Sequence, residues 1–165
     1  MKDIRIIKST ASQYQAIADI YNEYISLYGS TMVEKIHEES DIAKWIGGFN
    51  EKECLFSLMK EDQIIGWAVI KRYSERYGYR FAGETSLFIT QQYIGKGYGT
   101  FFKTFIIQRC RELGYHHLVA KIFSSNHVSI NYNLKLGYEI VGEQKEVGYK
   151  IGRWVNVTIL QLLLS

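Results

Sequence analysis

Three glycines alternate with other residues in the middle of the chain, at Gly95, Gly97 and Gly99, and their spacing suits phosphate binding. The residues up to Ile89 are typical of a strand and those from Tyr98 of a helix, so the glycines connect a strand to a helix. Glycine lets such a loop turn sharply and lets a ligand approach its backbone, while the free amides of the helix point at one spot. The loop predicts a pyrophosphate site, although a tight connection without a ligand uses the same residues.

Two common nucleotide-binding motifs do not fit this loop. A P-loop requires Ser or Thr directly after its Gly-Lys pair, whereas Lys96 is followed by Gly97. A dinucleotide fingerprint requires a parallel βαβ unit with an acidic residue about 20 positions further on. Here the preceding strands are expected to form an antiparallel meander. The next strand ends in Ser124, Ser125 and Asn126, none of which is acidic. The loop therefore belongs to a different class of site.

The elements around the loop are predicted from the periodicity of apolar residues. Thr10 and Gln13 form a capping-box pattern ahead of a first helix, which extends through Tyr28 and is ended by Gly29. Further helices are expected over 40–49, 98–113 and 126–136, and strands over 4–7, 55–60, 64–71, 81–90, 118–123, 138–149 and 154–164. The third strand should pair with the fourth. This order predicts one α/β (α+β) domain over residues 1–165 with a mixed sheet.

Composition narrows the class of protein. Of 165 residues, 47% are hydrophobic and 22% are charged, which excludes an intrinsically disordered chain. No apolar run reaches the roughly 20 residues that a membrane span needs, and no apolar segment follows the charged N-terminus as export requires. The 20 basic and 17 acidic residues give a net charge of +3, which is too balanced for a nucleic-acid partner held through its phosphates.

The cysteines and histidines carry little chemistry of their own. Cys54 and Cys110 lie far apart and belong to no paired motif, so we expect two free thiols and a cytoplasmic location. The four histidines show no metal-ligand spacing with these cysteines, so we expect no metal.

The glycine loop resembles motif A of the GNAT acetyltransferases, in which the pattern Arg/Gln-x-x-Gly-x-Gly/Ala binds the pyrophosphate of acetyl-CoA. In the gapless register the motif glycines are Gly97 and Gly99, and Ile94 stands at the Arg/Gln position. A second register starting at Gln92 satisfies the pattern but shortens the strand-to-helix connection. We prefer the first register, which leaves backbone amides, Lys96 and the helix dipole to hold the pyrophosphate.

The resemblance extends over nearly the whole chain. Asn126-x-x-Ser129 with the following Lys-Leu-Gly-Tyr run matches a later GNAT motif, and residues 148–157 resemble the C-terminal strands of the phosphinothricin acetyltransferase-like branch. Residues 20–22, 30–31 and 84–89 fit other segments of that branch. The resemblance implies the GNAT fold, a mixed and mostly antiparallel sheet of about six or seven strands flanked by about four helices.

The resemblance also implies acetyl-CoA as co-substrate and names its contacts. The implied cofactor-binding residues are Leu87, Phe88, Ile89, Gly95, Lys96, Gly97, Tyr98, Gly99, Thr100, Asn126, Ser129 and Asn133. A backbone amide within 87–89 would polarise the thioester carbonyl, provided that this strand splays from its neighbour as it does in the family.

Acetyl transfer to an amine requires a base, because an alkyl amine is protonated at neutral pH. Glu84 matches the acidic position of the branch's central strand and is our candidate catalytic base; an ion-paired surface carboxylate is the alternative. The acid for the departing thiolate is left open. Where family members have Tyr or His this chain has Asn133, which can only hydrogen-bond the sulfur. Tyr132 lies about 100° away on the helix, and we expect it in the core.

The acceptor is expected to bind between the loop after the first helix and the segment before the fourth strand. Our candidate substrate contacts are Lys35, Tyr79 and Phe81, with Tyr149 and Trp154 nearby. Lys35 or Arg80 would pair with a substrate carboxylate, and Glu34 would favour a cationic group.

These expectations describe an N-acetyltransferase that acts on a small amino-acid-like amine, of the phosphinothricin or methionine sulfone type, by direct attack in a ternary complex. Two alternatives stay open: another amine (a polyamine, an aminoglycoside or a protein N-terminus), or a catalytically weak acetyl-CoA sensor. The branch resemblance and the apolar C-terminal strand from Val157 to Leu163 predict a homodimer without membrane or nucleic-acid partners.

Overall fold

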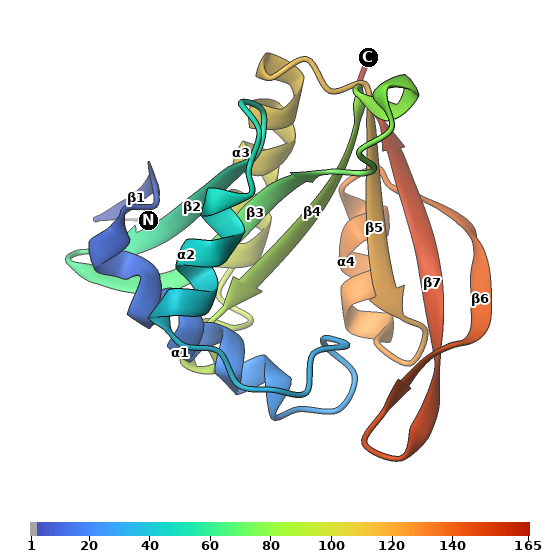
Figure 1. Ribbon diagram of the computed structural model, residues 1–165, viewed down its shortest axis with the longest axis horizontal. Coiled ribbons are helices and arrows are strands. Elements are labelled where there is room, and N and C mark those ends of the chain that lie inside the picture. The colour runs from blue at the N-terminus through green and yellow to red at the C-terminus, as the bar shows by residue number, and fades with distance from the viewer. Residues whose placement is uncertain (1–2) are drawn as a thin grey trace.

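The protein is described here by a computed structural model that covers residues 3–165. Seven strands form one sheet in the order β1-β2-β3-β4-β5-β7-β6 (Figure 1). The strands are β1 (Ile4–Lys8), β2 (Cys54–Lys60), β3 (Gln63–Arg72), β4 (Ala82–Ile89), β5 (His117–Phe123), β6 (Glu139–Lys150) and β7 (Arg153–Leu163). The helices are α1 (Tyr14–Ile25), α2 (Glu39–Gly47), α3 (Tyr98–Glu112) and α4 (His127–Lys135).

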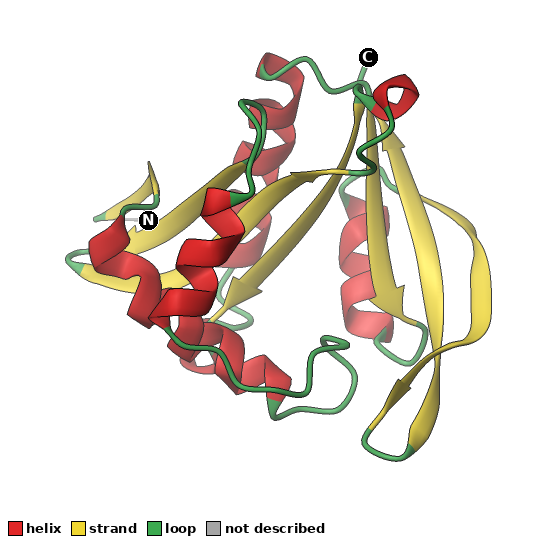
Figure 2. Cartoon of the chain, in the orientation of Figure 1, coloured by secondary structure: helices red, strands yellow, loops and turns green. Residues whose placement is uncertain are grey.

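Two apolar layers cover the sheet. Helices α1 and α2 pack on one face, where Ile17 and Ile42 meet Trp67 of β3. Helices α3 and α4 pack on the other face, where Phe102 and Ile130 join the larger core (Figure 2). Because side chains of a strand alternate between the faces, β3 supplies residues to both layers. The mixed sheet with four helices confirms the predicted fold class.

Strands β4 and β5 are the one parallel pair among residues 3–165, and they pair over only three positions, from Ala82 opposite His117 to Glu84 opposite Val119. Beyond Glu84 the two strands run apart, as Figure 1 shows between their labels. On its other side β4 stays paired with β3 along its whole length. The sheet therefore opens between Thr85 and Ile89, which is the predicted splay.

The first helix is shorter than predicted. It ends at Ile25 rather than Tyr28, and the capping-box residues Thr10 and Gln13 flank a short 3-10 turn that leads into it. The ammonium of Lys150 on β6 is fully buried and donates to the carbonyl oxygens of Ile25 (3.3 Å), Leu27 (3.1 Å) and Thr31 (2.6 Å). The ammonium thereby supplies hydrogen bonds to the carbonyl oxygens at the end of α1, which would otherwise accept from backbone amides of a further helical turn.

The C-terminal strand is an interior strand. β7 lies between β5 and β6, so Val157 and Leu160 fill the core instead of forming a free apolar face. This placement removes the strand as a reason to expect a dimer. Most exposed apolar side chains of this hairpin lie on the edge strand β6 and its turn, at Ile140, Val141, Val147, Tyr149 and Ile151, and β7 adds Trp154 and Leu163 near its two ends.

Gly66 allows β3 to approach the open part of β4 closely. A Cβ there would lie 2.6 Å from Ile89 Cδ1 and 2.8 Å from the carbonyl oxygen of Phe88, which is backbone and cannot yield. We expect Gly66→Ala to lower the free energy of unfolding by about 1–3 kcal/mol through overpacking, measured by urea denaturation.

The matched control is Gly47→Ala at the end of α2, where no atom of the described chain lies within 4 Å of the added Cβ. This variant should be neutral or should gain up to about 1 kcal/mol from helix propensity. Equal stability of the two variants would contradict the close approach at Gly66.

Candidate active site

The open part of the sheet forms a cleft of about 550 Å³. Its walls are β4, β5, the glycine loop and the first two turns of α3 and α4. The lining residues include Thr85, Ser86, Leu87, Phe88, Ile89, Gly95, Gly97, Gly99, Thr100, Lys103, Lys121, Asn126, Ser129, Tyr132 and Asn133. The cleft thus brings together every predicted cofactor-binding residue except Lys96 and Tyr98, whose side chains lie outside it.

The glycine loop leaves free donors at one end of the cleft. Gly97 precedes α3 with a φ of 84°, a left-handed conformation that favours glycine. The first amide to bond within the helix is that of Phe101, which donates to the carbonyl oxygen of Gly97 at 3.2 Å. The amides of Tyr98, Gly99 and Thr100 are the unpaired donors of the first turn, and with the helix dipole they favour an anion.

Helix α1 holds the strand end that enters this loop. The carboxylate of Glu23 accepts from the hydroxyl of Thr90 at 2.7 Å and from the amide of Gln91 at 2.8 Å. The hydroxyl of Tyr24 donates to the carbonyl oxygen of Ile89, and burial raises the pKa of Tyr24 to about 12, so this phenol stays protonated. These contacts fix the entrance of the cleft.

Helix α4 supplies the opposite wall. Asn126 caps it, its side-chain oxygen accepting from the amide of Ser129 at 3.1 Å. The hydroxyl of Tyr132 donates to the carbonyl oxygen of Gly99 at 2.6 Å, and burial raises the pKa of this phenol. The amide nitrogen of Asn133 donates to the carbonyl oxygen of Ser129 at 2.8 Å, while Asn133 Oδ1 is buried without a partner in the described chain.

Backbone amides of β4 also face the cleft. Tyr73 donates to the carbonyl oxygen of Ala82, and Thr90 donates to that of Ile65, so the even-numbered residues of β4 direct their backbone groups at β3. Backbone groups alternate in direction along a strand. The amides of Leu87 and Ile89 therefore point into the gap between β4 and β5.

A second pocket of about 500 Å³ opens on the other face of the sheet, beneath α1, α2 and the loop after α1. Aromatic side chains dominate its wall, and Lys71, Glu84 and Lys121 add charge. The two cavities share Ser30, Ser86, Phe88, Lys121 and Phe123. A ligand in the cleft can therefore reach a second ligand through the gap between the strands.

Glu84 lines the second pocket, and its ion-pair partner Lys121 lines both pockets. The Glu84 carboxylate oxygen Oε2 is 2.9 Å from the ammonium of Lys121 on the opposite side of the gap. The strand register places Lys71 directly beside Glu84. The second pocket thus carries both signs of charge within an apolar wall.

The predicted substrate contacts are not brought into this pocket. Lys35 is exposed on the loop after α1, and Phe81 packs under the cations of Lys52 (5.1 Å to the ring centre) and Arg80 (4.5 Å). Tyr79 makes an edge-to-face contact with Tyr73, with ring centres 5.3 Å apart, and the Tyr73 ring in turn contacts the Lys121 ammonium.

Other polar candidates also serve the fold. Glu34 accepts from the amide of Ile151 at 2.6 Å, which joins the loop after α1 to the β6–β7 turn. Sequence reasoning missed Thr85, Lys103 and Lys121 altogether. Lys103 follows Gly99 by four residues and precedes Ile106 by three, so helical periodicity places it on the inward face.

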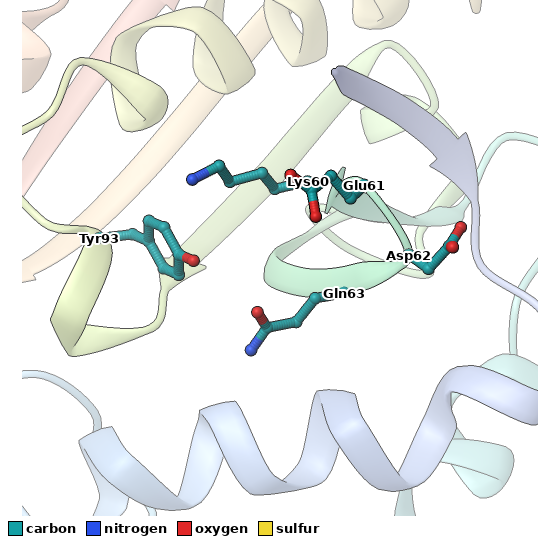
Figure 3. A pocket seen from close by; sticks show the side chains of 5 residues that line it. All are labelled: Lys60, Glu61, Asp62, Gln63 and Tyr93. Carbon is teal, nitrogen blue, oxygen red and sulfur yellow. The ribbon is translucent and has the colours of Figure 1, made fainter. Parts of the chain in front are cut away.

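A third hollow lies beside the glycine loop, between the β2–β3 turn and Tyr93 (Figure 3). Figure 3 shows Lys60 extending toward the Tyr93 ring, with its ammonium 5.1 Å from the ring centre. Lys96 approaches the same ring at 5.0 Å. Tyr93 also lines the cleft, so these two cations add positive charge next to the anion site.

Within residues 3–165 no group of three or more His, Cys, Asp or Glu residues has the arrangement of a metal site. In the same part of the chain no helix is long and apolar enough to cross a membrane.

Residues 4–159 match the family described as acetyltransferase (GNAT) domain. The chain belongs to the GNAT acetyltransferase family. This membership confirms the resemblance that the glycine loop and the later motifs indicated.

Among curated proteins, this GNAT chain is 36% identical over 103 residues to an L-methionine sulfoximine/L-methionine sulfone acetyltransferase of Pseudomonas paraeruginosa, covering 62% of this chain and 60% of the relative. That match spans less than two thirds of the relative's length. This chain is also 27% identical over 151 residues to the L-amino acid N-acyltransferase MnaT of Escherichia coli, and the match covers 91% of this chain and 88% of the relative. Among solved structures, it superposes with a TM-score of 0.92 and 26% identity on a phosphinothricin acetyltransferase from Sinorhizobium meliloti in complex with AcCoA, covering 99% and 89%.

The Tyr132 hydroxyl braces the first turn of α3 in this GNAT chain. We expect Tyr132→Phe to lower the free energy of unfolding by about 0.5–1.5 kcal/mol, because one buried hydrogen bond is lost and the Gly99 carbonyl keeps its place. Urea denaturation measures the change. Tyr77→Phe on the exposed 3-10 turn is the control and should change nothing. A Tyr132 variant as stable as wild type would show that the contact with Gly99 contributes nothing.

Proposed function

We propose that this protein is an N-acetyltransferase that moves the acetyl group of acetyl-CoA to the primary amine of a small amino-acid-like acceptor, of the phosphinothricin or methionine sulfone type. The observation that carries the proposal is the junction of two pockets at Lys121, the ion-pair partner of Glu84, with free amide donors at the far end of one pocket and both signs of charge in the other. The relatives named above act, by their names, on amino acids of this kind.

The cleft has the features that acetyl-CoA requires. The amides of Tyr98, Gly99 and Thr100 would hold the pyrophosphate, which compensates for the apolar Ile94 at the family's Arg/Gln position. The pantetheine would run along the unpaired edge of β4, where Leu87 and Ile89 offer backbone groups. The amide of Leu87 or Ile89 would then donate to the thioester oxygen as negative charge develops on it.

The second pocket favours an amino acid over a polyamine. The Glu84 carboxylate attracts an ammonium group, whereas Lys71 and Lys121 attract a carboxylate and repel additional positive charge. The aromatic wall suits the apolar part of a small side chain. A zwitterionic acceptor satisfies all three conditions.

Glu84 would act as the base. The acceptor amine loses a proton to the carboxylate, directly or through a water molecule, and attacks the carbonyl carbon across the gap. The ion pair with Lys121 holds the carboxylate at the border of the two pockets, which is the place where the amine must arrive. The acetyl group passes from sulfur to nitrogen in one ternary complex, without a covalent intermediate on the protein.

We further propose that the protein works in the cytoplasm as a homodimer. Its buried free thiols, Cys54 and Cys110, suit a reducing compartment. The exposed apolar side chains of β6 and its turn would be covered by a second copy of the chain. A monomer mass in light scattering at micromolar protein would contradict the dimer.

Replacement of Glu84 tests the base. We expect Glu84→Gln to lower kcat for acetyl transfer at least about 100-fold, because the amide cannot accept the proton, while the affinity for acetyl-CoA measured by calorimetry stays at the wild-type value. The matched control, Glu51→Gln on an exposed turn, should retain full activity. A Glu84→Gln enzyme with more than a third of the wild-type kcat would rule out this role.

The acceptor class is tested by thiol release over a panel of amines. We expect turnover with methionine sulfone, methionine sulfoximine and phosphinothricin, and weaker turnover with spermidine or an aminoglycoside. The reverse order would overturn the amino-acid assignment. Tight binding of acetyl-CoA with no turnover of any amine would contradict an enzymatic function and would favour an acetyl-CoA sensor.

A further inference from the structure

Lys103 is a buried cation in the wall of the cleft. Only 3% of this residue is exposed, and its ammonium donates to the hydroxyl of Thr85 at 2.7 Å. Within residues 3–165 no carboxylate forms an ion pair with it. An unpaired charge inside a protein is costly, so the chain keeps this ammonium at the expense of its stability.

The surroundings of Lys103 define its charge state. The titratable groups that face it are Cys110 on its own helix and Tyr138 before β6, whose ring centre is 5.2 Å from the ammonium. Burial raises the pKa of both groups to about 12, so they are neutral near pH 7. Burial lowers the pKa of Lys103 to about 8. The ammonium is therefore mostly protonated at neutral pH, yet it can give up a proton.

Lys103 lies at the closed end of the cleft, where the pairing between β4 and β5 ends. Its partner Thr85 is the first β4 residue beyond the last pair with β5. Lys103 also lies one helical turn after Gly99, about 6 Å along the axis of α3 from the anion site. Thr85 is followed directly by Ser86, which lines both pockets. The ammonium is thus near the junction at which the thioester must meet the amine.

Asn133 and Tyr132, which lie at and beside the position of the acid in family members, are poor proton donors here. The Tyr132 hydroxyl is committed to the Gly99 carbonyl oxygen, and its raised pKa makes it a weaker acid. The Asn133 amide donates to Ser129, and its free atom, Oδ1, is an acceptor. Lys103 holds three protons, of which one is used on Thr85.

We propose that Lys103 is the acid that gives a proton to the departing thiolate of coenzyme A. The inference rests on the proposed acetyl transfer. The amine nitrogen bonds to the carbonyl carbon, the C–S bond breaks with its electron pair on sulfur, and sulfur takes a proton from the Lys103 ammonium. The proton of the amine leaves through Glu84, and the neutral Lys103 amine regains a proton from solvent when the products depart.

The first test is kinetic. Lys103→Met should lower kcat about 100-fold, with little change in KM for acetyl-CoA. The wild-type kcat should fall above about pH 8, where Lys103 loses its proton, and this fall should be absent from the variant. Lys103→Arg keeps the charge but gives up no proton, so its kcat should lie between the two. Lys44→Met on the exposed face of α2 is the matched control and should behave as wild type.

Folding of the variant is checked separately. Because Lys103→Met removes an unpaired buried charge, its thermal midpoint at pH 7 should rise above that of wild type. A structural role for Lys103 would instead lower the midpoint and leave the shape of the pH profile unchanged, and that outcome would overturn the proposal. Lys103→Gln replaces the methionine variant if the latter does not fold.

The second test needs no acceptor amine and therefore separates this proposal from the proposed function. Coenzyme A is bound to the protein, and ionisation of its thiol is followed by the ultraviolet absorbance of the thiolate. We expect the bound thiol to ionise at lower pH in wild type than in Lys103→Met, by about one unit, because the ammonium favours the anion. Equal titrations would overturn the role of Lys103 even if the enzyme turns over. An enzyme that binds coenzyme A and shows the shift, but accepts no amine, would contradict only the proposed function.

Discussion

Regular pairing between two parallel strands is interrupted in this protein, and its site exists because of that interruption. β4 and β5 share three paired positions and then separate, although a continuous sheet would satisfy more backbone groups. The separation is maintained by what packs on either side: β3 holds one edge of β4, β7 holds the far edge of β5, and α3 and α4 lie behind the opening. Two strands thus stay well paired on their outer sides and leave their inner edges for ligands.

The same opening explains how charge is distributed. Donors gather at one end, where α3 begins, and titratable groups gather at the other end, where the strands close. Glu84 lines the second pocket, whereas Lys103 of α3 bonds in the cleft to Thr85, the next residue of β4. In the mechanism we propose, the base and the acid therefore act from two sides of one carbonyl without neutralising each other. If Lys103 takes the place of the family's Tyr or His as we propose, the proton comes from α3 rather than from α4.

Much of this arrangement could be predicted from the chain. Helices and strands were recognisable from apolar periodicity, and the loop from its glycines, because these signals are local. The end of α1 was not, because it is set by Lys150, which lies 125 positions further along the chain from Ile25. The position of Tyr79 depends on a 3-10 turn that directs neighbouring side chains differently from a strand. Lys103 was overlooked because a lone lysine on a helix is usually solvated, and only tertiary packing reveals that this one is buried.

The buried Lys150 has a consequence for the second pocket, which we propose to hold the acceptor. One ammonium joins the end of α1 and the loop after it to the last hairpin, and Glu34 adds a second tie to the same turn. Part of the pocket wall is thus built from segments far apart in the chain, around Thr31 and around Gly148, which complete the wall formed by the central strands. A designer who wishes to transplant the loop of a relative with a different acceptor must transplant residues 148–154 with it. Exchange of only one of the two segments would leave three carbonyl oxygens or the Lys150 ammonium without hydrogen-bond partners. A change of specificity therefore requires that both segments come from the same relative.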